Sequence, residues 1–295
     1  MRADQNARDR LSAATTVVGV IGDPVAHSLS PLLHNTAFAE LGLDWVSLGF
    51  SVPSGSAADA LRGAVALGIR GLSVTMPHKE AVALLVDEST PLAARLGAVN
   101  CVTFDRGTSS GDNTDGPGLV AALARGAGFD PAGRRCLIVG AGGAARAAIA
   151  ALADAGATEV VVANRTPERG VAAAALAGPV GRVGSAADAS ECDLVVDATP
   201  VGMAGRALPG EVWAVDPSLL GTGQVVVDLV YDPPETPWLA AARARGATVA
   251  SGIGMLVHQA ALQLEKWTGE AAPVGAMWAA VEPPKGSPKR ASEPS

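Results

Sequence analysis

Short apolar runs alternate along the chain with longer segments whose apolar residues recur at helical spacing. Near the N-terminus the apolar runs cover residues 17–21, 45–51 and 71–74, and each run is typical of a buried strand. The two segments between these runs are predicted helices, and a glycine follows each one. Strands that alternate with helices over short connections predict a parallel sheet covered by helices.

The same alternation continues through the rest of the chain. A short strand is predicted over residues 98–102, and a helix is predicted from the glycine-rich segment near Gly111 to about Arg125. Further strands are predicted over residues 137–139, 159–163, 192–198, 225–230 and 248–250, followed by one more helix after Gly252. Repeated strand–helix units in this half are typical of a second parallel sheet.

The pattern predicts an α/β protein of two domains. The first is an open, mostly parallel α/β domain over residues 15–118, and the second is a Rossmann-like domain over residues 119–252. Helices over residues 253–281 are expected to return to the first domain. Residues 1–14 and 282–295 offer little to bury, so we expect both segments to be disordered.

The composition narrows the class of function. The 295 residues carry a net charge of −7, which argues against nucleic acid or an anionic membrane surface as a partner. The three cysteines and four histidines follow no metal-like spacing, so no metal site is predicted, and a reduced, cytoplasmic protein is the simplest interpretation. No uncharged apolar run reaches about 18 residues, so no membrane span is expected. The partners are expected to be small molecules, and the sequence leaves monomer and homodimer both open.

A glycine-rich turn follows the predicted strand at 137–139. The spacing Gly140-x-Gly142-x-x-Ala145 fits a fingerprint of dinucleotide-binding folds. Gly140 permits the sharp turn, Gly142 leaves room for a pyrophosphate beside the backbone, and Ala145 lets the following helix pack closely. The start of that helix offers free N–H groups and the positive end of its dipole to phosphates. Because such turns also occur in ordinary α/β connections, the motif needs support from its context.

The next predicted strand supplies that context. It ends at Asn164, about 20 residues beyond the glycines, where an acidic residue would hold the ribose of NAD. Here the chain has Asn164, Arg165 and Thr166, followed by Arg169. Two guanidinium groups suit a 2′-phosphate, because arginine pairs with phosphate oxygens through two donors. The cofactor is therefore predicted to be NADP; the alternative is that both arginines belong to a solvated helix start.

Polar side chains follow the first and third predicted strands. Ser28 and Ser30 come after the first strand, and Thr75 and Lys79 come after the third. Ligands bind beyond the carboxyl ends of the strands in open parallel sheets, so these four side chains are expected on one rim. Ser30 is also predicted to cap the helix that follows, with Pro31 at its first position.

Lys79 is the best candidate proton donor on this rim, and Asp115 is its expected partner. A nicotinamide cofactor transfers hydride, and a carbonyl group that accepts hydride becomes an alkoxide, which needs a proton donor within hydrogen-bond reach. The alternative for Lys79 is a surface lysine at a helix start, although that end of a helix disfavours a cation. The alternative for Asp115 is a plain helix cap. The charge of Asp115 favours the protonated form of Lys79, which helps the lysine give a proton in the reduction. In the reverse oxidation Lys79 must accept a proton, so the oxidation is expected to be fastest at alkaline pH.

Together these motifs resemble the shikimate dehydrogenase family. The resemblance runs from about Val17 to Trp278, in one order and at compatible spacings. The segments that carry it are Gly22–Pro31, Val74–Lys79, Ala98–Asn100, Gly111–Gly116, Gly140–Ala144, Asn164–Thr166 and Gly254–Gln259. Asp23, Ser73 and Asp197 depart from the family pattern, which often has Asn at these positions, and Ser73 could alter one hydrogen bond to the substrate.

The resemblance implies the reversible, NADPH-dependent reduction of 3-dehydroshikimate to shikimate, with Lys79 as general acid and base assisted by Asp115. By the resemblance, the substrate-binding residues are Ser28, Ser30, Thr75, Lys79, Asn100, Asp115, Gln259 and Tyr231. The cofactor-binding residues are expected to be Gly140, Ala141, Gly142, Gly143, Ala144, Asn164, Arg165, Thr166, Arg169, Gly252 and Met255. A polyhydroxylated ring needs such a set, because each buried hydroxyl left unpaired costs about 1–3 kcal/mol.

Two other functions stay open at this point. Quinate dehydrogenase is a sister activity that shares most of these motifs and often uses NAD, against which Arg165 and Arg169 argue. A non-catalytic regulator that senses NADP or shikimate belongs to a different class, and it would be free to lose Lys79 or Asp115. This chain keeps both residues and has no basic arm.

Overall fold

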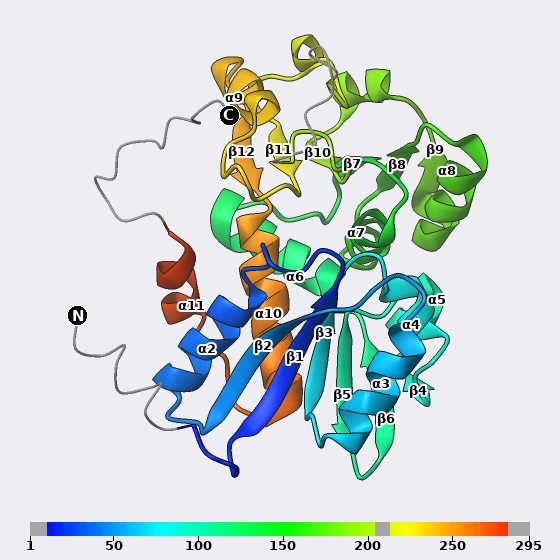
Figure 1. The fold of residues 1–295 in the computed structure, drawn as a ribbon. Coiled ribbons are helices and arrows are strands. Elements are labelled where there is room, and N and C mark those ends of the chain that lie inside the picture. Colours follow the sequence, from blue (N-terminus) through cyan, green and yellow to red (C-terminus); the bar gives the residue numbers. More distant parts are fainter. Residues whose placement is uncertain (1–10, 204–212, 283–295) are drawn as a thin grey trace, which may run out of the picture.

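The computed structural model describes residues 11–203 and 213–282, which form two six-stranded sheets in separate halves of the molecule (Figure 1). The first sheet has the order β2-β1-β3-β5-β6-β4 and the second has the order β12-β11-β10-β7-β8-β9. The strands of the first sheet are β1 (Thr16–Gly22), β2 (Trp45–Ser51), β3 (Gly71–Val74), β4 (Glu88–Ser89), β5 (Cys101–Asp105) and β6 (Thr108–Asp112). Those of the second are β7 (Arg135–Val139), β8 (Glu159–Ala163), β9 (Gly181–Val183), β10 (Leu194–Asp197), β11 (Val225–Asp228) and β12 (Thr248–Ser251). The predicted α/β class with two sheets is confirmed.

Helices cover both faces of each sheet. The α-helices are α2 (Ser30–Glu40), α3 (Ala57–Ala66), α4 (Lys79–Ala83), α5 (Pro91–Leu96), α6 (Asp115–Ala122), α7 (Gly143–Asp154), α8 (Pro167–Ala174), α9 (Pro237–Ala244), α10 (Ile253–Thr268) and α11 (Val274–Val281). A π-helical turn, η1 (Leu123–Ala127), continues α6, and the 3₁₀ turns are η2 (Ala175–Val180), η3 (Ala186–Glu191) and η4 (Pro217–Leu219). None of these helices, among the described residues, is long and apolar enough to cross a membrane.

The strands of the second sheet are continuous apolar runs because both faces of this sheet are covered. In β7, Cys136 and Ile138 pack into one buried cluster with helix α7, and Leu137 packs on the other face with helix α9. All strand pairs described in this sheet are parallel. A parallel strand covered on both faces needs apolar residues at every position rather than at alternate ones.

Helix α6 lies between the two halves of the molecule and is packed closely on both sides (Figure 1). A Cβ atom at Gly116 would lie 2.6 Å from the carbonyl oxygen of Ala147 in α7. A Cβ atom at Gly118 would lie 2.8 Å from the backbone nitrogen of Gln259 in α10. Two glycines therefore let α6 bring the residue that begins it, Asp115, close to both α7 and α10.

Two local predictions were wrong. Ser30 does not cap α2: Leu29 is the N-cap residue with helical backbone angles (φ −82°, ψ −6°), and Ser30 is already inside the helix. The hydroxyl of Ser28 accepts a 3.3 Å hydrogen bond from the Ser30 backbone N–H, so the preceding turn satisfies this donor instead. The strand predicted over 98–102 covers Cys101–Asp105, where it pairs antiparallel with β3.

The sequence pattern also missed β4, which has two residues only, as well as β6 and β9. Strand β6 reads Thr-Ser-Ser-Gly-Asp and has no apolar run, and β9 has three residues only. The predicted disorder of residues 1–10 and 283–295 falls outside the described residues. Within residues 11–15 the chain forms a turn in which the Thr15 backbone N–H donates to the Ser12 carbonyl oxygen at 3.1 Å.

Candidate functional site

A cavity of about 1080 Å³ lies between the two sheets, at the carboxyl ends of strands from both. It is lined by all but one of the residues predicted to bind substrate or cofactor: Ser28, Ser30, Thr75, Lys79, Asn100, Asp115, Gly140, Ala141, Gly142, Gly143, Ala144, Asn164, Arg165, Arg169, Tyr231, Gly252, Met255 and Gln259. The exception is Thr166, an exposed residue whose carbonyl oxygen accepts a 2.8 Å hydrogen bond from the Asn164 side chain.

Lys79 and Asp115 form an ion pair in this cavity. The Lys79 Nζ lies 2.6 Å from Asp115 Oδ2, and the two side chains are 18% and 5% exposed. Lys79 begins α4 and Asp115 begins α6, so both lie in the first turn of a helix. The helix dipole favours the carboxylate there and disfavours the ammonium group, so the contact with Asp115 is what makes a lysine favourable at this position.

A buried amide network holds Asp115 from the opposite side. The Asn100 side-chain nitrogen donates to Asp115 Oδ1 at 2.7 Å, and the Asn100 side-chain oxygen accepts from the Thr114 backbone N–H at 2.7 Å. Asn100 is 1% exposed, so each of these polar atoms needs a partner inside the protein. The network therefore orients the Asp115 carboxylate toward Lys79.

Gln263 is part of this network, and the sequence analysis missed it. Its side-chain nitrogen donates to the Asn100 carbonyl oxygen at 3.0 Å and to Gln259 Oε1 at 2.9 Å. It lies one turn after Gln259 on α10 and is completely buried. The signal that could have found it is this four-residue spacing, which puts two glutamines on one helix face.

The glycine turn after β7 has the room that a dinucleotide requires. Gly140 has φ +116°, a conformation that residues with a side chain rarely adopt. A Cβ atom at Gly142 would meet nothing within 4 Å, so the backbone faces open space. A Cβ atom at Gly143 would lie 3.5 Å from Lys79 Cδ, which brings the lysine to the mouth of the turn. The turn therefore leaves open space beside its backbone, and Lys79 lies next to it.

The far end of the cavity carries two exposed guanidinium groups. Arg165 and Arg169 follow β8, and Arg169 Nη2 lies 3.5 Å from the Ala141 carbonyl oxygen. Gly184, Ser185 and Ala186, which follow β9, line the same end. The sequence analysis missed these three residues because it missed the short strand that precedes them.

Two buried aspartates end neighbouring strands beneath the cavity. Asp197 of β10 and Asp228 of β11 are register partners, and each accepts a hydrogen bond from a backbone N–H two residues further on. Burial raises the pKa of Asp197 to about 7, with a further contribution from the charge of Asp228. Burial also raises the pKa of Asp228. The residues that these carboxyl groups hold, Thr199 and Val230, line the cavity.

The chain matches three family models that together cover most of it. Residues 20–102 match the shikimate dehydrogenase substrate binding domain, residues 123–199 match the shikimate/quinate 5-dehydrogenase family, and residues 252–282 match the shikimate 5′-dehydrogenase C-terminal domain. A shikimate dehydrogenase (NADP(+)) from Methanopyrus kandleri is 50% identical over an aligned length of 286, and the alignment covers 92% of this chain and 96% of the relative. The chain belongs to the shikimate dehydrogenase family.

Solved structures of this family have the same fold. The shikimate 5-dehydrogenase from Thermus thermophilus, solved with NADP(H) and shikimate, has a TM-score of 0.82 and 38% identity, and the match covers 90% of this chain and 98% of that one. The quinate dehydrogenase from Corynebacterium glutamicum, solved with NAD, has a TM-score of 0.81 and 32% identity over 90% and 98% of the two chains. As a shikimate dehydrogenase family member, this chain is an oxidoreductase with a Rossmann-like second half.

The structure also locates the three residues that depart from the shikimate dehydrogenase pattern. Ser73 is buried in β3 and lines the cavity. Asp23 is exposed and lies outside the residues that line it. Asp197 is buried at the end of β10, beside its register partner Asp228 on β11. Two of the three departures therefore lie in or directly beneath the site.

Proposed function

We propose that this chain catalyses the reversible, NADPH-dependent reduction of 3-dehydroshikimate to shikimate. The observation that carries the proposal is the 2.6 Å Lys79–Asp115 ion pair beside the glycine turn, inside a cavity large enough for a cofactor and a small acid. A proton donor and a phosphate-binding turn that face one cavity are the two parts that a carbonyl reduction needs.

Lys79 acts as the general acid in the reduction. When bound, the nicotinamide supplies the hydride that reaches the carbonyl carbon. The Lys79 ammonium group gives one proton to the carbonyl oxygen as negative charge develops there, and the product is an alcohol. In the oxidation the neutral amine of Lys79 takes that proton back. Asp115 holds the Lys79 Nζ in place and balances its charge, since it is only 5% exposed and has no other cation among its described contacts.

The substrate is held by the polar groups around this pair. Ser28 and Ser30 offer hydroxyl donors for the carboxylate, and Thr75, Asn100 and Gln259 offer partners for the ring hydroxyls. The Gln259 side-chain nitrogen donates to the Leu256 carbonyl oxygen at 2.8 Å, so its amide is already oriented. Tyr231 lies at the cavity wall, where burial raises the pKa of its hydroxyl and keeps it protonated as a donor.

The cofactor would lie along the second sheet. The pyrophosphate fits the N–H groups at Gly142–Ala144, where a Cβ atom at Gly142 would find open space. Arg165 and Arg169 suit a 2′-phosphate, which favours NADP over NAD. Gly252 and Met255 line the part of the cavity that joins the two halves, beside the place where the nicotinamide must meet the substrate.

The experiment is a side-by-side assay of the purified protein. Shikimate and quinate are each oxidised with NADP⁺ and with NAD⁺, and kcat/KM is measured for all four pairs. We expect shikimate with NADP⁺ to be the best pair. A clear preference for quinate with NAD⁺ would assign the sister activity, and no turnover with any pair, together with tight NADP⁺ binding, would assign a sensing role.

A further inference from the structure

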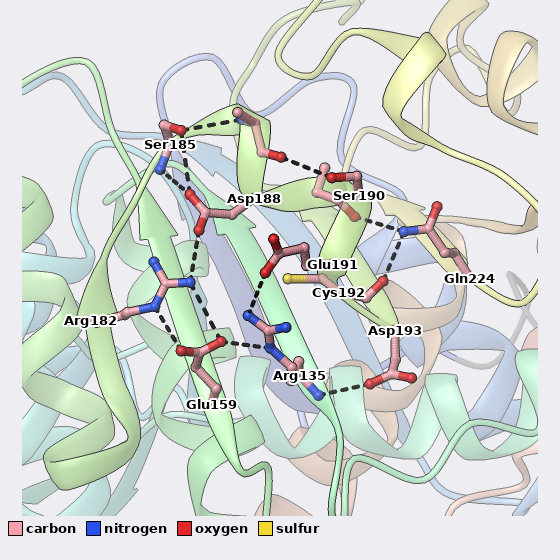
Figure 2. Close-up of polar contacts among 12 residues, drawn as sticks. Arg135, Glu159, Arg182, Ser185, Asp188, Ser190, Glu191, Cys192, Asp193 and Gln224 are labelled. Carbon is pink, nitrogen blue, oxygen red and sulfur yellow. Dashed lines mark hydrogen bonds and ion pairs between the residues drawn. The ribbon is translucent and has the colours of Figure 1, made fainter.

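A chain of ion pairs lies beneath the end of the cavity that Gly184, Ser185 and Ala186 line, and it takes no part in the function proposed above. Figure 2 shows it: Arg182 lies between Glu159 and Asp188, and Arg135 lies between Glu159 and Glu191. Arg182 Nε donates to Glu159 Oε1 at 2.7 Å, and Arg182 Nη2 donates to Asp188 Oδ1 at 2.7 Å. The pairs are partly shielded from water, since the side chains of Glu159 and Asp188 are 26% and 20% exposed.

The chain of ion pairs ends at a residue that lines the cavity. The second carboxylate oxygen of Asp188, Oδ2, accepts a 2.8 Å hydrogen bond from the Ser185 backbone N–H, and the Ser185 hydroxyl lies 3.3 Å from the same atom. These contacts hold the pKa of Asp188 below its ordinary value, first through the Ser185 backbone and then through Arg182. One carboxylate therefore ties the segment 184–186 to the guanidinium group of Arg182.

Gly184 shows how closely this segment rests on the ion pair. A Cβ atom at Gly184 would lie 2.7 Å from Asp188 Oδ2 and 2.9 Å from Arg182 Nη1. The nearest atom to that position is Val161 Cγ1, and the Gly184 backbone N–H donates to the Val162 carbonyl oxygen at 3.0 Å. Strand β8 therefore holds Gly184, while Asp188 holds the next residue, Ser185, to the ion pair.

The position of the segment identifies the part of the cofactor that it faces. The glycine turn after β7 takes the pyrophosphate, and the nicotinamide half must reach Lys79 on one side of it. The adenosine half must then extend the other way, along the ends of β8 and β9. Arg165 and Arg169 follow β8, and the segment 184–186 follows β9 on the neighbouring strand, so these two groups flank one end of the cavity.

We infer that Asp188 and Arg182 are positioning residues for the adenosine half of the cofactor, because they fix the segment 184–186 as one wall of its binding site. The inference rests on the proposed function, since it assumes that NADP lies along the second sheet. With the wall already in place, the cofactor does not have to order it on binding, which improves affinity without any direct contact from either side chain.

The test compares Asp188→Asn with Glu191→Gln. In Asp188→Asn the amide has one acceptor oxygen, so either Arg182 or the Ser185 N–H loses its partner. Glu191→Gln makes the same carboxylate-to-amide change at the other end of the chain of ion pairs, where Glu191 contacts Arg135 at 3.1 Å and does not contact the cavity wall. The probe is adenosine 2′,5′-bisphosphate, whose Kd is measured by calorimetry, along with kcat and the KM values for NADP⁺ and shikimate.

We expect Asp188→Asn to raise the Kd of the probe and the KM for NADP⁺ about three- to tenfold, with kcat and the shikimate KM within about twofold of wild type. Glu191→Gln should leave all four values within about twofold. An unchanged probe Kd in Asp188→Asn, an equal change in Glu191→Gln, or a parallel loss of kcat would overturn the inference. If Asp188→Asn does not fold, Arg182→Lys decides by the same readings, because a lysine has no separate donor nitrogens to replace Nε on Glu159 and Nη2 on Asp188. Wild-type protein that neither binds the probe nor turns over with NADP⁺ would instead refute the proposed function.

Discussion

Asp197 offers a direct test of the electrostatics beneath the cavity. The side chain is 2% exposed, and burial raises its pKa from the ordinary value of 3.8 to about 7. The charged group beside it is Asp228, its register partner on β11, which disfavours a second negative charge. In Asp197→Asn the amide oxygen can still accept the Thr199 N–H that now donates to Asp197 Oδ1 at 2.8 Å, while the titrating proton is removed.

The direction of the pH effect on stability follows from the protons that the folded and unfolded states bind. Between about pH 4 and about pH 7 the folded protein keeps the Asp197 proton, whereas the unfolded chain has lost it. The contribution of Asp197 to stability is therefore fully present below the unfolded pKa and is lost as the pH rises through the folded pKa. A rise from 3.8 to about 7 corresponds to ~4 kcal/mol at roughly 1.4 kcal/mol per pKa unit. Between about pH 5 and about pH 8 the wild-type protein loses ~2–3 kcal/mol of this stabilisation.

The assay is urea unfolding of wild type and Asp197→Asn at about pH 5, 6, 7 and 8. The variant should gain ~2–3 kcal/mol relative to wild type between the lowest and the highest pH. Asp216→Asn is the matched control, because Asp216 accepts the same kind of hydrogen bond from Ser218 N–H but is exposed and has a lowered pKa. The difference in free energy of unfolding between Asp216→Asn and wild type should stay constant over these four pH values. Parallel pH profiles for wild type and Asp197→Asn would show that the folded protein does not hold a proton there.

Three further predictions address the packing and the site. Gly71→Ala places a Cβ atom 2.3 Å from Trp267 Nε1 and should lower the free energy of unfolding by ~1–3 kcal/mol. Gly63→Ala on α3, where a Cβ atom meets nothing within 4 Å, should raise it by ~0.5–1 kcal/mol; urea unfolding that gives both variants the same sign would contradict this. Arg169→Gln should raise the KM for NADP⁺ at least about tenfold and leave the KM for NAD⁺ nearly unchanged; equal changes for both would remove Arg169 from 2′-phosphate recognition. Shikimate oxidation should be fastest at alkaline pH, because Lys79 must accept a proton, and a rate that falls from neutrality upward while the protein stays folded would count against it.

The elements that the sequence predicted well are those whose pattern follows from burial on both faces. Strand β8 has an apolar run over Val160–Ala163, and its bounds of Glu159–Ala163 agree with the prediction. The Gly140 turn was found because its positive φ restricts the residue type. Lys79 was found through strand ends and chemistry, whereas Asp115 as its partner and the rest of the site depended on the resemblance.

The features that the sequence did not predict depend on contacts between distant segments. Strand β5 begins at Cys101, directly after Asn100, whose side chain donates to Thr114 and Asp115 on a distant segment. At Ser185 the cavity wall donates to Asp188, which pairs with Arg182, and these contacts link a 3₁₀ turn to an edge strand too short to leave a pattern. Such contacts depend on the tertiary fold, which local hydrophobic spacing does not encode.

The most direct test of the central claim is the turnover of Lys79→Ala with shikimate and NADP⁺. Lys266→Ala is the matched control, because Lys266 also pairs with an aspartate, Asp112, and does not line the cavity. We predict that kcat falls at least about 100-fold in Lys79→Ala while the variant stays folded and keeps its Kd for NADP⁺ near wild type, and that Lys266→Ala keeps normal turnover. Near-normal kcat in folded Lys79→Ala would show that the proton comes from elsewhere.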